Sequence, residues 1–102
     1  MIVKHSEVPV EPETREEAIE LLEALAADSR AEEGVIKYRV TADLEDPNTI
    51  RIFEQYRDQA AADAHEESDH LAAFERAFEP HLAGRSTLHS FDVRSKTTTD
   101  GP

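Results

Sequence analysis

Residues 50–70 read IRIFEQYRDQAAADAHEESDH, and within them a strand pattern passes into a helix pattern. The alternation of apolar and polar residues over Ile50–Tyr56 predicts a strand. Asp58 follows in a polar turn and can cap a short helix over Gln59–His65, with His70 five residues further on. Polar side chains at such a junction can form the mouth of a small-molecule pocket.

The sequence before this junction predicts a strand and a helix. Ile2–Val10 is rich in valine and is typical of a strand. Thr14-x-x-Glu17 is a capping-box pattern, in which hydroxyl and carboxylate each bind a free backbone amide of the first turn. Apolar residues at helical spacing follow, so we expect a helix over roughly 14–31 that Gly34 ends.

The remaining sequence predicts two more strands and a second helix. Val35–Ala42 is a strand pattern, and the turn around Asp46-Pro47 joins it to the strand that ends at Tyr56. Ser68 can cap a second helical segment, and Thr87–Val93 forms the last strand. In this second segment an apolar stripe is formed by Leu71, Phe74, Phe78 and Leu82.

The order β-α-β-β-α-β predicts an α+β fold, a ferredoxin-like sandwich. Its four-stranded antiparallel sheet would carry both helices on one face. We expect a single domain over residues 1–95 and a flexible polar tail over 96–102.

Both faces of the predicted sheet carry apolar side chains. Phe53 and Val35 would lie on one face, and Ile52 and Ile36 on the other. A sheet that is apolar on both sides is expected to bury its open face against a copy of itself, so we expect a homodimer.

The composition excludes several classes of function. Asp and Glu number 23 against 11 Lys and Arg, a net charge of −12. This balance argues against nucleic acids and acidic membrane surfaces as partners, because phosphate binding needs a basic surface. There are no cysteines, hence no disulfides or thiolate sites. No apolar run has the length of a membrane span, so we expect a soluble, cytoplasmic protein.

Several motifs together resemble the antibiotic-biosynthesis monooxygenase (ABM) domain family. The resemblance covers about residues 2–94 and implies a dimeric α/β barrel of the ferredoxin-like type. It rests on Glu33-Gly34-x-x-x-Tyr38, the Asp46-Pro47 turn, Phe53-Glu54-x-Tyr56 and Ala64-His65-x-x-Ser68-x-His70-x-x-x-Phe74.

The resemblance implies a cofactor-independent monooxygenase that acts on a small quinol-like or enolisable substrate. Many oxygenases and haem degraders of the family carry Trp where this chain has Tyr56. The Glu-x-Tyr version is similar to the autoinducer-2-processing branch, whose proposed active-site tyrosine and histidine fall on Tyr56 and His65. Two alternatives therefore stay open: an isomerase of a small phosphorylated carbonyl compound, and a non-catalytic dimer that binds haem or another small molecule.

Three side chains are the candidate catalytic residues. His65 can move a proton because imidazole titrates near neutral pH; the alternative is a polar residue at a helix end. Tyr56 can donate a hydrogen bond to a developing oxyanion; the alternative is a core aromatic. Glu54 shares the Tyr56 face and can orient an imidazole or act as a base; the alternative is a salt bridge. We expect His70, Tyr38 and Phe74 to bind the substrate.

A metal site is not expected. His65-Glu66-x-x-x-His70 is one residue longer than a zinc-binding helix motif. On a continuous helix two residues five apart point about 140° apart, so they share no ligand face. A break near Ser68 could bring the two imidazoles together, with Glu66 or Asp69 as further ligands.

The acid-rich, lysine-poor composition resembles that of proteins from salt-loving microbes. Repulsion among the carboxylates should destabilise the folded chain at low ionic strength, and salt should screen it. We expect the Tm to rise by about 5 °C or more between about 0.1 and 1 M KCl. A thermal melt followed by circular dichroism measures this, and a flat Tm would contradict it.

Overall fold

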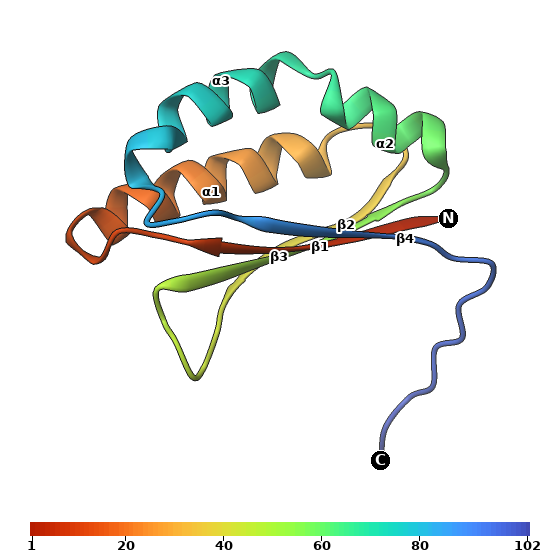
Figure 1. Cartoon of the computed structure of the whole chain (residues 1–102). Helices are drawn as coiled ribbons and strands as arrows, with labels where there is room; N and C mark the ends of the chain where they lie inside the picture. The colour runs from red at the N-terminus through yellow and green to blue at the C-terminus, as the bar shows by residue number, and fades with distance from the viewer.

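The computed structural model describes residues 1–102, and its elements follow the predicted order with two 3-10 turns added. Figure 1 shows two layers, a sheet and a row of helices that all lie on one of its faces. The elements are β1 (Ile2–Pro9), η1 (Pro12–Thr14), α1 (Arg15–Arg30), β2 (Val35–Ala42), β3 (Thr49–Tyr56), α2 (Gln59–Glu66), α3 (Asp69–Phe78), η2 (Glu79–His81) and β4 (Thr87–Asp92).

The four strands form one antiparallel sheet in the order β2-β3-β1-β4. This order confirms the predicted ferredoxin-like fold. The central strands β1 and β3 pair so that Lys4 lies opposite Glu54, and β2 places Tyr38 opposite Glu54 on the other side. Within the sheet itself, Glu54 is thus flanked by Lys4 on one side and Tyr38 on the other.

Strand alternation sorts the side chains of β3 between the two faces of the sheet. Ile50, Ile52, Glu54 and Tyr56 are all buried on the face that the helices cover. By strand alternation Phe53 belongs to the opposite face, and it is 37% exposed. The predicted faces of this strand are confirmed, because residues two apart in a strand share a face.

The predicted face of Val35 is wrong. The β2–β3 register shifts between Val35 and Lys37, so Val35 pairs with Tyr56 and packs with the buried side chains under the helices. Such a bulge adds one residue to a strand and reverses the faces of the residues on one side of it. Val35 and Phe53 therefore lie on opposite faces of the sheet.

The predicted capping box at the start of α1 is also wrong. Thr14 occupies the N-cap position, but its side chain makes no capping hydrogen bond. The 3-10 turn η1 leads straight into the helix, and the Thr14 hydroxyl instead lies 2.8 Å from Nδ1 of His81. The helix ends at Arg30, and Gly34 follows in the turn before β2 with a φ of +86°.

The other two predicted caps are confirmed. The Asp58 carboxylate accepts from the amide of Ala61 at 2.9 Å, and the Ser68 hydroxyl accepts from the amide of Leu71 at 3.3 Å. Ser68 thereby ends α2 and starts α3 in a new direction. The core between α1, α3 and the sheet is apolar and contains Val8, Val10, Ala18, Leu22, Leu25, Ala26, Tyr38, Ile50, Ile52 and Phe78.

None of the helices combines the length and apolar character that crossing a membrane requires. After β4 the chain forms no further helix or strand and runs away from the sheet (Figure 1). The division into a domain of residues 1–95 and a tail of residues 96–102 stays a prediction.

Candidate functional site

A cavity of about 350 Å³ lies between the sheet and the helices α1, α2 and α3. Its walls are mostly apolar, and its polar end is formed by Tyr38, Glu54 and His65. Leu88 lines it from the edge strand β4 while being half exposed, so the cavity opens to solvent along that strand. The apolar wall consists of Val8, Leu25, Ile52, Leu71, Phe74, Phe78, Leu82 and Leu88.

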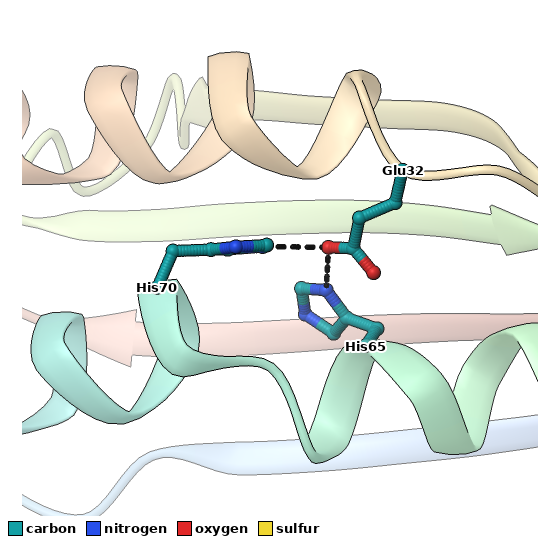
Figure 2. A group of neighbouring side chains, drawn as sticks. All are labelled: Glu32, His65 and His70. Carbon is teal, nitrogen blue, oxygen red and sulfur yellow. Dashed lines mark hydrogen bonds and ion pairs between the residues drawn. The ribbon is translucent and has the colours of Figure 1, made fainter.

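The break between α2 and α3 decides where the two predicted histidines point. His65 is in the last turn of α2, His70 is in the first turn of α3, and the Ser68 hydroxyl donates to the carbonyl of His65 at 2.7 Å. The change of direction brings both imidazoles to one carboxylate, that of Glu32 (Figure 2). Two residues that a continuous helix would hold apart therefore meet.

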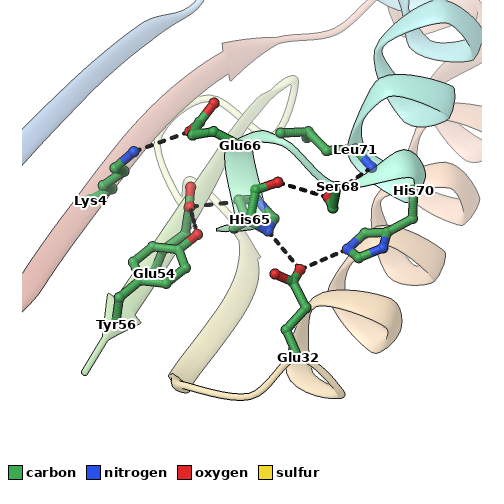
Figure 3. Close-up of polar contacts among 9 residues, drawn as sticks. All are labelled: Lys4, Glu32, Glu54, Tyr56, His65, Glu66, Ser68, His70 and Leu71. Atoms are coloured by element: carbon green, nitrogen blue, oxygen red, sulfur yellow. Dashed lines mark hydrogen bonds and ion pairs between the residues drawn. The ribbon is translucent and has the colours of Figure 1, made fainter. Parts of the chain in front are cut away.

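His65 is almost completely enclosed, with 2% of its surface exposed. Its ring centroid lies 5.4 Å from that of Tyr38 and 5.6 Å from that of Tyr56. Nδ1 is hydrogen-bonded to Oε2 of Glu32 at 2.8 Å, and Nε2 lies 3.9 Å from Oε1 of Glu54 (Figure 3). One imidazole nitrogen thus faces a loop and the other faces the cavity end of β3.

Glu54 is a buried carboxyl with a phenol as its hydrogen-bond donor (Figure 3). Tyr56 lies two residues along the same face of β3, and its hydroxyl donates to Oε1 of Glu54. Burial raises the pKa of Glu54, although the Tyr56 hydrogen bond and the nearby His65 and Lys4 act in the opposite direction. A buried carboxyl with a raised pKa is suited to exchange a proton with a neighbouring group.

The two tyrosines differ in their access to the cavity. Tyr38 lines it, whereas Tyr56 is fully buried and lies behind Glu54. Burial, followed by the charge of Glu54, raises the pKa of both phenols well above the usual value. Both hydroxyls therefore stay protonated, and that of Tyr56 donates a hydrogen bond to Glu54.

The predicted substrate-binding residues are also divided. Phe74 lines the cavity and stacks on Phe78 with ring centroids 4.8 Å apart. His70 does not line the cavity; it lies on the far side of Glu32, beside a shallow hollow between α1 and α3. Of the six predicted site residues, those that contact the cavity directly are Tyr38, Glu54, His65 and Phe74.

Glu32 is a site residue that the sequence did not reveal. It follows α1 in the loop to β2, where no periodic pattern distinguishes it from the neighbouring Glu33. The Glu32 side chain is 14% exposed and that of Glu33 is 90% exposed. Only the folded position of the loop, against the end of α2, separates the two.

Glu32, His65 and His70 are also the residues that could hold a metal ion. One ligand atom from each lies within 4.8 Å of the others. The helix break noted in the sequence is present, but the third group is Glu32 rather than Glu66 or Asp69. Each imidazole bonds Glu32 through one nitrogen only, so haem ligation would use the other nitrogen, Nε2 of His65 or Nδ1 of His70.

Comparison with known proteins decides the family. Residues 1–77 match the family model described as "Antibiotic biosynthesis monooxygenase", ABM. The chain belongs to this family.

The chain is also similar to individual proteins of known sequence or structure. The chain is 36% identical over 74 residues to a Bacillus subtilis (strain 168) protein named "Putative monooxygenase YcnE", covering 72% of this chain and 78% of that protein. It matches PA3566 from Pseudomonas aeruginosa with a TM-score of 0.83 and 28% identity, over 92% of this chain and 94% of that chain. A Deinococcus radiodurans structure shares the fold with a TM-score of 0.90 at 20% identity, over 99% of this chain and 100% of that one.

The raised pKa of Glu54 predicts a pH-dependent effect of the substitution Glu54→Gln. Above the ordinary carboxyl value of 4.5, the unfolded chain releases this proton before the folded chain does. The Glu54 contribution to stability therefore falls as the pH rises from 4.5 to the folded pKa, and then levels off. Glu54→Gln removes this pH-dependent loss of stability. The loss amounts to about 1.4 kcal/mol for each pH unit between the pKa of Glu54 in the unfolded chain and its pKa in the folded chain.

Urea unfolding of the wild type and Glu54→Gln between pH 4 and 8 measures the difference in the free energy of unfolding. We expect the free energy of unfolding of the variant, relative to that of the wild type, to increase as the pH rises. Glu23→Gln, on the exposed side of α1, is the control and should show a constant difference. A constant difference for Glu54→Gln would mean that its pKa is not raised.

Proposed function

We propose that this ABM protein is a monooxygenase that acts on a small quinol-like or enolisable substrate without flavin, nicotinamide or metal. One observation carries the proposal: a buried carboxyl with a raised pKa and a buried imidazole meet at the polar end of an apolar cavity. Paired groups of this kind can remove a proton from a bound substrate. Family membership and the similarity to YcnE support oxygen as the second reactant.

The charge of the cavity favours a neutral substrate. Four carboxyl side chains line it, and no lysine or arginine does. A phosphorylated substrate would meet these carboxyls without a cationic partner, which argues against the isomerase alternative. The apolar walls fit an aromatic ring, as in a quinol. The four acidic residues are Glu54, Glu66, Glu75 and Glu79.

The proposed chemistry begins with removal of a proton from a quinol hydroxyl. The resulting anion is electron-rich enough to reduce dioxygen, and the oxygen bonds to a ring carbon as a hydroperoxide. Loss of water then leaves a quinone with one added oxygen atom. The balance is one quinol and one O₂ giving one hydroxyquinone and one H₂O, so no other reductant is needed.

The residues divide this work according to their positions. His65 and Glu54 form the proton-transfer pair, because the Nε2 of His65 faces the Glu54 carboxyl at the cavity. Tyr38 lines the cavity and supplies a protonated phenol close to the developing oxyanion. Tyr56 acts indirectly, through Glu54, because its hydroxyl donates a hydrogen bond to the Glu54 carboxyl.

His65→Ala tests this function. Loss of an acid–base group should lower turnover by about 100-fold or more, because the proton-transfer pair then lacks its imidazole and only Glu54 is left. Oxygen uptake with a panel of chemically reduced benzoquinols and naphthoquinols measures it. His81→Ala is the control, since His81 bonds Thr14 and lines no cavity. The proposal fails if the wild type consumes no oxygen with any quinol, or if the folded His65→Ala protein keeps its activity.

We also propose that the protein is a homodimer joined through the open face of the sheet. Phe53 and Phe91 are 37% and 52% exposed on this face, and Phe91 lies opposite Val3 in the strand pairing. Apolar side chains gathered on an uncovered sheet are unusual for a monomer. The ABM family membership supports the same arrangement.

Phe53→Asp should shift the protein from dimer to monomer, because it would bury two charges in the interface. Size-exclusion chromatography with light scattering distinguishes the dimer from the 11.4 kDa monomer. Leu44→Asp is the matched control, since Leu44 is fully exposed in the β2–β3 turn. A wild type that elutes as a monomer, or a Phe53→Asp protein that stays dimeric, would contradict the proposed interface.

A further inference from the structure

A single carboxylate oxygen of Glu32 contacts two imidazoles. Its Oε2 lies 2.8 Å from Nδ1 of His65 and 2.7 Å from Nε2 of His70 (Figure 2). The three residues come from three different elements: the α1–β2 loop, the end of α2 and the start of α3. Glu32 does not line the cavity, so it contacts His65 on the side of the imidazole that faces away from the cavity.

The distances distinguish a hydrogen-bonded group from a metal centre. Ligands about 2.1 Å from a tetrahedral ion lie about 3.4 Å from one another. The observed separations of 2.7 and 2.8 Å are instead those of charge-assisted hydrogen bonds. The oxygen of Glu32 lies where it accepts from two N–H groups.

This contact determines which nitrogen of His65 carries the proton. A carboxylate oxygen only accepts hydrogen bonds, so Nδ1 of His65 must be the N–H donor. In the neutral ring Nε2 is then bare, and it is the nitrogen that faces Glu54 at the cavity. Neutral imidazole in water prefers the opposite form, with the proton on Nε2, so the protein has to impose this one.

The loop that carries Glu32 is tightly held. Gly34 has a φ of +86°, and a Cβ at this position would lie 2.6 Å from that of Ala61. The Gly34 carbonyl also accepts from the amide of Arg57 at 2.8 Å. These contacts pack the loop on the first turn of α2. A positioning group needs such support, because small displacements weaken the geometry of a site.

We infer that Glu32 is a positioning residue that holds His65 as the Nδ1–H tautomer, with His70 as the second donor that keeps the carboxylate in place. Nε2 of His65 is thereby left free to take a proton at the cavity. The catalytic consequence rests on the proposed function, whereas the tautomer does not. When His65 takes up a proton, the charge of Glu32 stabilises the imidazolium.

Nitrogen-15 NMR of the histidine side chains tests the tautomer without any substrate. In the wild-type protein, dialysed against a chelator, neutral His65 should show a protonated Nδ1 and a bare Nε2. In Glu32→Ala the Nε2–H form should become the major one. Glu33→Ala, which changes the adjacent and exposed glutamate, should leave the spectrum of His65 unchanged.

Kinetics with a quinol accepted by the wild type provide the second measurement. Because Glu32 does not line the cavity, Glu32→Ala should lower kcat by about 100-fold while KM changes by less than about 2-fold. Glu33→Ala should retain wild-type kcat. If Glu32→Ala does not fold, Glu32→Gln keeps the size of the side chain and one accepting oxygen, and it should lower kcat by a smaller factor, because only the charge that stabilises the imidazolium is lost.

Three results would overturn the inference. One is a wild-type His65 that is protonated on Nε2 when neutral, and another is a tautomer that does not respond to Glu32→Ala. The third is stoichiometric binding of Zn²⁺, detected as a shift of His65 Nδ1 and His70 Nε2 on titration, because Glu32 would then be a metal ligand. If His65 has the expected tautomer and quinols are not oxidised, the proposed function fails and the role of Glu32 in setting the tautomer stands.

Discussion

A carboxyl group buried on the central strand β3 organises the functional half of this protein. Glu54 lies under the helices, where an unpartnered charge would strongly destabilise the fold. The groups around Glu54 stabilise its charged form. Tyr56 donates a hydrogen bond to it, and His65 and Lys4 carry compensating positive charge when protonated. Because burial still dominates, the pKa stays raised and the carboxyl is ready to exchange a proton.

Two apolar clusters pack on the helix-facing side of β3. Toward Ile50 the side chains join the core formed with α1 and α3. Toward Tyr56 they join a smaller apolar cluster under α2, with Ile2, Ala61 and Ala62. The cavity is lined by side chains of the larger cluster and by Glu54 and His65. An aromatic substrate can therefore contact hydrocarbon along most of its surface and present one polar edge to Glu54 and His65.

The polar contacts around His65 join four segments of the chain. Glu32 connects the α1–β2 loop to both short helices, and Lys4 of β1 reaches Glu66 of α2 at 3.1 Å. Each contact crosses between elements that are distant in the sequence. The position of His65 is consequently fixed from the loop, the strand and the neighbouring helix at once. An imidazole held in this way keeps one orientation, which proton transfer requires.

The acidic character of the whole chain extends into the site. A net charge of −12 and a cavity lined by carboxyls act in the same direction, against anionic ligands. The buried Lys4 is engaged with Glu66 and does not line the cavity. The preference for a neutral substrate that we propose thus follows from the local lining as well as from the overall composition.

Local patterns were enough to predict the element order, the fold and the faces of β3, because strand alternation and the caps at Asp58 and Ser68 each depend on a few neighbouring residues. The sequence also indicated Glu54, Tyr56 and His65, which are close together in the chain. It could not reveal the bulge in β2, the lost cap at Thr14 or the role of Glu32. Those depend on contacts between residues far apart in sequence, such as His81 with Thr14 and His65 with Glu32, and only the tertiary structure decides which of two adjacent glutamates faces inward.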